Sequence, residues 1–161
     1  MRFIAYDRPA AVSYAERWAL SRNPEYYDFD GLGGDCTNFV SQCIYAGCGV
    51  MNYTPQVGWY YISLNDRAPA WTGVNQFYRF MTENQGRGPF ARSVPRYELL
   101  PGDVVQLGSS DGVFYHSLLV LGVSAGGEIY IASHSYDSLW RELSSYSYAK
   151  ARYLHILGAR D

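Results

Sequence analysis

The sequence predicts an α+β fold in which N-terminal helices pack on one side of a C-terminal, mainly antiparallel sheet. Before residue 86, three segments carry apolar side chains at the three- and four-residue spacing of helices. From Pro101-Gly102 onward, short runs rich in β-branched and aromatic residues alternate with Gly- and Ser-rich turns. Helices grouped before strands are typical of layered α+β domains. With 161 residues, 48% of them hydrophobic, we expect residues 1–161 to form a single domain.

Capping residues delimit the first and third predicted helices. Asp7 or Arg8 caps the first, which we place at 8–22, just before an Asn-Pro pair. Thr72 is the expected cap of the third helix, whose apolar side chains keep helical spacing until the glycine-containing segment 84–86. Both helices therefore offer an apolar face to the sheet.

The second predicted helix covers 35–46, with Gly47 as a left-handed C-cap, and carries Cys36 in its first turn. Backbone N–H groups at a helix start lack partners and carry partial positive charge, which predicts a lowered pKa for the Cys36 thiol. Gly33 and Gly34 would let a substrate backbone approach the sulfur. Cys36 is therefore a candidate nucleophile, and a buried, inert cysteine at an ordinary loop–helix junction is the alternative.

The second half of the chain contains β-favouring runs separated by turn residues. Four strands are predicted: 103–107, 116–123, 128–133 and 152–157.

A cysteine nucleophile needs a base, and histidine is the side chain best suited to that role near neutral pH. His116 begins one predicted strand and His134 ends the next, with a turn over 124–127 between them. A two-residue turn would set His116 opposite Asp137, whereas a three-residue loop would set it opposite His134. Either partner would orient the His116 imidazole by accepting one ring N–H.

The other histidine and cysteines are expected to be structural. His155 lies in an apolar strand, where a hydrogen-bonded core histidine is the usual finding. Cys43 and Cys48 are assigned to packing, with a bridge between them as the alternative.

A zinc site is the competing use of the candidate catalytic residues. His116, His134, Asp137 and Cys36 could supply four ligands, but their spacing has none of the tight intervals of zinc motifs. We therefore expect no metal and no other cofactor.

Charge and hydropathy exclude two classes of partner. The formal net charge is −2 and Lys and Arg are scattered, so nucleic acid is not an expected partner. No apolar run approaches the ~20 residues that span a bilayer, so membrane insertion is not expected. The start lacks the apolar region of a signal peptide, so secretion or attachment to a cell wall would depend on a segment outside this chain. The oligomeric state and the cellular location stay open.

Two further residues are candidates for substrate binding. Trp59 belongs to the aromatic segment 53–61, which would either line a groove for sugars or peptides or anchor a long loop to the core. Asp35 would either meet a substrate amine or cap the second helix, and capping is the favoured interpretation.

Several motifs together resemble the bacterial putative amidase domain over nearly the whole chain. They are Gly-Gly-Asp-Cys-Thr-Asn-Phe-Val-Ser-Gln at 33–42, Trp-Tyr-Tyr at 59–61, Gly-Asp-Val-Val-Gln-Leu at 102–107, His-Ser at 116–117 and Ala-Ser-His-Ser-Tyr-Asp at 132–137. That group is similar to the papain-like NlpC/P60 and CHAP superfamily, whose members cleave amide bonds in peptides, often those of peptidoglycan. The best-known NlpC/P60 pattern has Ser-Gly after the cysteine, where this chain has Thr37-Asn38.

The resemblance implies a papain-like fold in which Cys36 is the nucleophile, His116 the base and His134 the orienting residue. The expected reaction is amide hydrolysis through a thioester that water releases. The Cys36 N–H would be the first oxyanion donor. Papain-like enzymes often use a glutamine upstream of the cysteine as the second donor, but no glutamine precedes position 42 here, so Asn23 or a tyrosine would supply it. An acyltransferase or transamidase that uses the same site, and a non-catalytic wall- or glycan-binding module, are the alternative functions.

Overall fold

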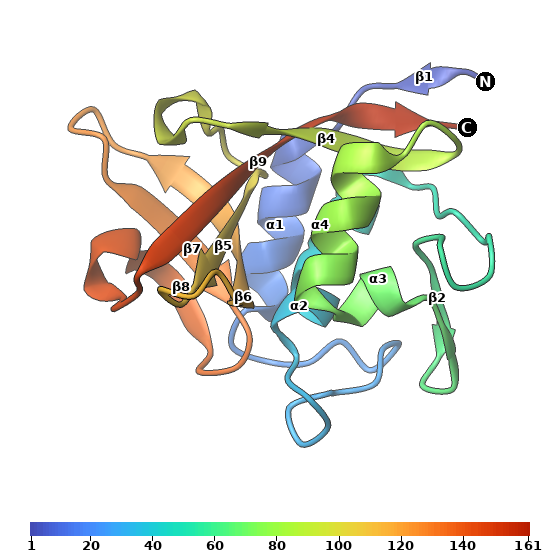
Figure 1. The fold of residues 1–161 in the computed structure, drawn as a ribbon, viewed down its shortest axis with the longest axis horizontal. Helices are drawn as coiled ribbons and strands as arrows, with labels where there is room; N and C mark the ends of the chain where they lie inside the picture. The colour runs from blue at the N-terminus through green and yellow to red at the C-terminus, as the bar shows by residue number, and fades with distance from the viewer.

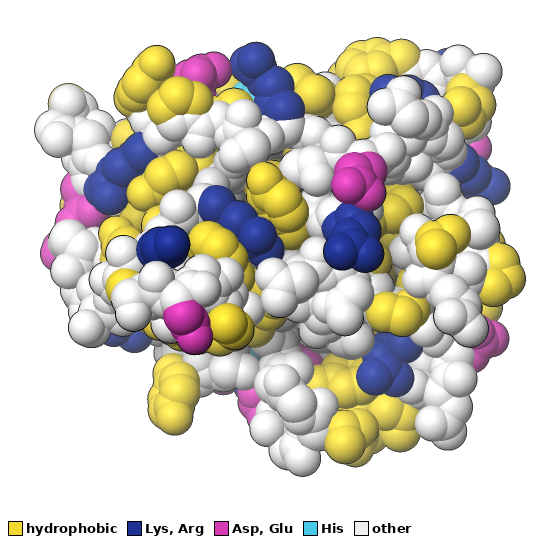
Figure 2. Space-filling view, in the orientation of Figure 1, with side chains coloured by type: hydrophobic (Ala, Val, Ile, Leu, Met, Phe, Trp, Pro, Cys, Tyr) yellow, Lys and Arg dark blue, Asp and Glu magenta, His cyan; other side chains and the backbone are white.

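The computed structural model describes residues 1–161 and has the predicted α+β architecture (Figure 1). Its helices are α1 (Arg8–Trp18), α2 (Cys36–Cys48), α3 (Pro69–Thr72) and α4 (Val74–Glu83), with short 3-10 turns at Arg96–Glu98 and Leu143–Ser145. None of these helices has the length and apolar character needed to cross a membrane. On the face drawn in Figure 2, Lys and Arg side chains lie singly among polar and apolar ones.

A seven-stranded antiparallel sheet forms the other half of the fold, in the order β1-β9-β5-β6-β7-β8, with β4 also paired to β9. Its strands are β1 (Phe3–Ile4), β4 (Gly88–Val94), β5 (Val104–Gly108), β6 (Phe114–Val123), β7 (Ile129–Ser133), β8 (Ser138–Glu142) and β9 (Lys150–Arg160). A separate hairpin pairs β2 (Tyr61–Ser63) with β3 (Asp66–Arg67). The four predicted strands correspond to β5, β6, β7 and β9.

Alternation along the central strands divides the core between the two faces of the sheet. Val104 and Leu119 face the helices and belong to a cluster of 23 buried residues. Val105 and Leu118 face the opposite side and belong to a cluster of nine. In Figure 1 the helices occupy the centre and right, and β5 to β8 lie to their left. The first turn of α2 therefore meets the sheet from the helical side.

The ends of two helices differ from the prediction because packing decides them. α2 continues through Gly47 to Cys48, and Gly49 is its left-handed C-cap, with φ of 72° and an N–H that donates to the Tyr45 carbonyl at 2.8 Å. Gly47 lies inside the helix, where the Tyr6 ring packs directly against it. Thr72 does not cap α4: it ends α3, and Gly73 precedes α4.

The first helix is capped as predicted but is shorter. The Asp7 carboxylate accepts from the Ala10 N–H at 3.0 Å, and α1 ends at Trp18 instead of continuing to residue 22.

We expect Gly47→Ala to destabilise the protein. A Cβ at this position would lie 2.5 Å from Tyr6 Cε1 and 2.9 Å from the Asp7 carbonyl oxygen. Because one of the crowded atoms is backbone, the steric cost of about 1–3 kcal/mol should exceed the ~1 kcal/mol of helix propensity that alanine adds. Urea unfolding measures the difference. Gly31→Ala, with no atom within 4 Å of its new Cβ, is the control, and equal stability of the two variants would contradict the prediction.

Candidate functional site

Cys36 is the first residue of α2 and lies at the junction between this helix and the sheet. Gly33 and Gly34 lead into it with φ of 87° and 100°, in the left-handed region that favours glycine. The Cys36 side chain is only 7% exposed. The structure therefore places the Cys36 thiol where the sequence predicts it, at a helix start that follows a glycine turn.

Hydrogen bonds join the first turn of α2 to β6. The Thr37 and Ser117 hydroxyl oxygens are 2.9 Å apart, and Gln106 Nε2 donates to the Ser117 oxygen at 3.1 Å. The Ser117 N–H lies close enough to the Cys36 sulfur to lower the pKa of its thiol. This N–H is available because β7 pairs with β6 only from Leu119 onward. The sulfur therefore lies against β6, directly beside the residue after His116.

Cys36 and His116 line one cavity of about 530 Å³, at the place where α2, β6 and the segment after β7 meet. The other lining residues are Gly33, Gly34, Leu107, Tyr115, Ser135, Tyr136, Arg141, Tyr146 and Ser147. Arg141 is the one residue with a full charge in this set. The structure thus brings the candidate nucleophile and the candidate base to the same space.

The His116 imidazole is free to act as a base. None of the hydrogen bonds in the structure involves its ring nitrogens, and its nearest aromatic neighbour is Tyr146, with ring centroids 5.9 Å apart. Burial, followed by the positive charge of Arg141, lowers the pKa of His116 from 6.5 to about 4. At neutral pH the imidazole is therefore uncharged and can accept a proton.

The structure does not pair His116 with either predicted partner. His134 is buried, and its Nδ1 lies 2.5 Å from Asp35 Oδ2 while its Nε2 donates to the Trp18 carbonyl at 2.7 Å. Asp137 accepts from two Arg22 nitrogens, each at 2.9 Å. Both polar groups are therefore held by other side chains.

The β6–β7 hairpin has neither of the two predicted registers. Val123 pairs with Ile129, and an irregularity between Val120 and Gly122 shifts the pairing so that Leu119 meets Ala132. The extra residue on β6 changes which residues oppose one another further along the strands. β7 then ends at Ser133, so no ladder partner faces His116 from this strand.

Asp35 is buried and does not line the cavity. Its Oδ1 accepts from the Phe29 N–H and the Asn38 side-chain amide, each at 2.8 Å, and its Oδ2 contacts His134. Asp35 occupies the N-cap position of α2, as the favoured interpretation predicted, but its side chain makes no cap hydrogen bond to the helix. The carboxylate holds the loop that precedes the helix, and its predicted contact with substrate has no support in this geometry.

Trp59 anchors its loop to the core, the second of the two predicted alternatives. The side chain is 0% exposed, its indole N–H donates to Ser41 at 3.0 Å, and its ring packs on Trp71 at 4.6 Å. Trp59 is not among the residues that line the cavity, so its predicted role in binding substrate also has no support here.

His155, Cys43 and Cys48 have the structural roles expected of them. His155 Nδ1 lies 2.8 Å from the buried Asp103 carboxylate, which also pairs with Arg8. Both cysteines are free and buried. No group of three or more His, Cys, Asp or Glu side chains is arranged to hold a metal ion.

The structure reverses the predicted direction of the Cys36 pKa. Burial raises the pKa of this thiol and outweighs the lowering effects of the Ser117 and Thr37 N–H groups and the Thr37 hydroxyl. The sequence predicts the N–H groups at the helix start but not the depth at which they lie. A neutral thiol beside a neutral imidazole is the expected resting state at pH 7.

We expect the rate of Cys36 alkylation by iodoacetamide to rise with pH, with a midpoint above the ~8.5 of an ordinary thiol. The sign follows from the raised pKa, since only the thiolate reacts and less of it is present at any lower pH. His116→Ala should leave the midpoint above 8.5, because the neutral imidazole contributes no positive charge to remove. Mass spectrometry of Cys36 over pH 5–10 measures both profiles. A midpoint below 7 would instead indicate a thiolate–imidazolium pair at rest.

Two side chains of the cavity were missed by the sequence analysis. Arg141 lies on β8 and Tyr146 follows the 3-10 turn after it. β8 was not predicted, and no motif marks either residue. Asn23, a predicted second oxyanion donor, lies elsewhere and donates to the Tyr14 hydroxyl at 3.1 Å. Tyr115, Tyr136 and Tyr146 are the tyrosines that line the cavity.

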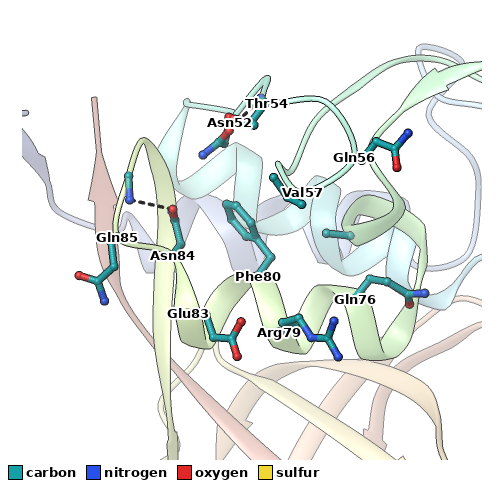
Figure 3. A pocket seen from close by; sticks show the side chains of 12 residues that line it. Asn52, Thr54, Gln56, Val57, Gln76, Arg79, Phe80, Glu83, Asn84 and Gln85 are labelled. Carbon is teal, nitrogen blue, oxygen red and sulfur yellow. Dashed lines mark hydrogen bonds between the residues drawn. The ribbon is translucent and has the colours of Figure 1, made fainter.

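A second cavity, of about 420 Å³, lies between α4 and the loop before β2 and is lined by no cysteine, serine or histidine (Figure 3). Phe80 and Val57 reach toward each other across it. Asn52 and Asn84 are bound to backbone groups of the adjoining loops. These amides are therefore structural, and the cavity with Cys36 is the candidate functional site.

Comparisons with known proteins agree with the resemblance seen in the motifs. The model of one protein family, described as "Putative amidase domain", matches residues 5–157. The "Uncharacterized protein YhbB" of Bacillus subtilis (strain 168) is 32% identical over 143 residues, which cover 87% of this chain and 45% of that protein. The chain thus spans less than half the length of that relative. No solved structure matches the chain.

Proposed function

Because the chain belongs to the Putative amidase domain family, we propose that it is a cysteine-dependent amidase that hydrolyses amide bonds in peptides. The family match supports amide hydrolysis. The observation that carries the cysteine mechanism is the cavity shared by Cys36, at the start of α2, and His116, on β6. A nucleophile and a base that face one space are what acyl transfer requires.

The proposed reaction has two halves. His116 takes the thiol proton as the Cys36 sulfur bonds to the substrate carbonyl carbon. The carbon–nitrogen bond then breaks as His116 returns that proton to the departing amine, which leaves a thioester. Water, deprotonated by His116, attacks the thioester and releases the carboxylic acid and the free thiol. A neutral His116 imidazole suits this order of steps, because the thiol proton moves to it only when the substrate is present.

Two local features support the oxyanion and positioning roles. The Cys36 N–H is the first of α2, where backbone N–H groups have no intrahelical acceptor, so it is available to the developing oxyanion. His134 acts as a positioning residue in this proposal. Through Asp35 it holds the loop that brings Gly33 and Gly34 to the cavity wall.

The substrate class follows from the motif resemblance to the NlpC/P60 and CHAP superfamily. We propose peptides of the peptidoglycan type as substrates, with the cavity between Gly34 and Arg141 receiving the acyl side of the scissile bond.

Product analysis tests this proposal directly. The purified chain is incubated with peptidoglycan stem peptides in H₂¹⁸O, and new carboxylates and amines are identified by mass spectrometry. Hydrolysis places one ¹⁸O in each new carboxylate. Hydroxylamine added as an acceptor reports acyl transfer by forming hydroxamates. The proposal fails if no new amine appears with any amide substrate while the protein is folded.

A further inference from the structure

Resting on the proposed function, we propose that Arg141 is the specificity-determining residue of the site and binds a carboxylate on the acyl part of the substrate. The substrate class is then narrowed to amides whose acyl group carries a second, anionic group close to the scissile carbonyl. The proposal stands on the placement of Arg141, on what holds it and on the absence of an acid that would neutralise it.

Arg141 is held in a fixed orientation at the cavity wall. Its guanidinium carbon lies 3.6 Å from the centroid of the Tyr146 ring. Its Nε donates to the Ser145 hydroxyl at 2.7 Å, and its Nη2 donates to the Ser145 carbonyl at 3.3 Å. The third nitrogen, Nη1, has no acceptor in the structure. A planar guanidinium that is held in one position and still has N–H groups without an acceptor is suited to bind a carboxylate.

No acidic side chain neutralises this charge. None of the ion pairs in the structure includes Arg141, and no Asp or Glu lines the cavity. The carboxylates in the neighbouring loops, Asp30 and Asp137, are both bound to Arg22. The cavity that Cys36 lines therefore presents one uncompensated positive charge.

Tyr146 is a neighbour of both this charge and the base. Its ring contacts the Arg141 guanidinium and neighbours the His116 ring, whose surroundings also include Cys36 from α2 and Tyr115 from β6. The Arg141 charge already affects proton binding at His116. A carboxylate bound to Arg141 would offset that charge and strengthen His116 as a base when substrate is present.

The test compares two reagents that differ only in charge. With both iodoacetate and iodoacetamide, the Cys36 thiolate bonds to the CH2 carbon and displaces iodide, so the ratio of their rates does not depend on the thiolate fraction. After normalisation to free cysteine at pH 9, we expect the wild-type ratio to favour iodoacetate and to fall about tenfold in Arg141→Met. Arg141→Lys should retain part of the preference, and 0.5 M NaCl should lower it in the wild type.

Arg79→Met, in the second cavity, is the matched control and should leave the ratio unchanged. The Arg141 proposal is overturned if wild type and Arg141→Met share one ratio while Cys36 reacts normally. If neither reagent labels Cys36 in the folded protein, the proposed function fails, and the Arg141 proposal fails with it. The two failures are therefore distinguishable.

Discussion

Cys36→Ala should reduce amide hydrolysis to the rate of the uncatalysed reaction, and His116→Ala should lower kcat by about 10²–10⁴. Without the sulfur there is no atom to form the thioester, so the whole acyl-enzyme route is lost. Without the imidazole, the buried thiol has no acceptor for its proton, and burial already raises its pKa. Single-turnover measurement of amine release gives both values without interference from product release.

The chain contains a well-matched control for the first variant. Cys48 ends the same helix and is 7% exposed, the same fraction as Cys36, but it lies in the core away from the cavity. Cys48→Ala should keep wild-type activity, and thermal unfolding should show that all three variants are folded. Turnover by Cys36→Ala at the wild-type rate would remove this residue as the nucleophile. Added imidazole should restore part of the activity of His116→Ala, since the cavity has space for a small base.

The sequence predicts the junction that carries Cys36 because its determinants are local. Glycines, a helix start and apolar spacing all lie within about fifteen residues, and the strand of His116 is marked by its own apolar run. These two elements come together because their apolar faces share one core. Periodicity therefore predicts that the helix packs on the sheet.

The surroundings of the two residues depend on features that periodicity does not contain. One extra residue in β6 sets the register of the hairpin, so the partner of His116 could not be derived from the turn residues. β8 has few buried positions and a residue, Trp140, with φ of 52°, so its sequence gives no clear strand pattern. Arg141 was missed with that strand. The direction of the Cys36 pKa was wrong because burial is a property of the folded chain.

Asp35→Ala should lower the free energy of unfolding by about 3–5 kcal/mol, the largest stability effect that we expect at the site. The substitution leaves three buried donors without their acceptor: the Phe29 N–H, the Asn38 amide and the His134 ring. His134→Phe keeps the stacking on Phe39 but removes the contact with Asp35 and the hydrogen bond to the Trp18 carbonyl. The other two donors keep their acceptor, so its cost should be smaller, about 2 kcal/mol. Urea unfolding at pH 7 measures all of the variants.

Asp35→Asn separates the hydrogen bonds of this carboxylate from its charge. The asparagine oxygen can still accept from Phe29 and Asn38. Its amide can donate to His134 Nδ1 when that nitrogen carries no hydrogen, which reverses the direction of the wild-type contact. This arrangement is complete because His134 Nε2 already donates to the Trp18 carbonyl. We therefore expect Asp35→Asn to cost only about 1 kcal/mol. Asp137→Ala, which removes a partly exposed partner of Arg22, should cost no more than that.

The same variants should change activity through the loop that Asp35 holds. The Asp35 side chain fixes the Phe29 backbone to the start of α2, and the loop between them carries Gly33 and Gly34, which line the cavity. Asp35→Ala should therefore lower kcat/KM, and Asp35→Asn should preserve it along with stability. If Asp35→Asn were as damaging as Asp35→Ala, the negative charge itself, and not the set of hydrogen bonds, would be what the site requires.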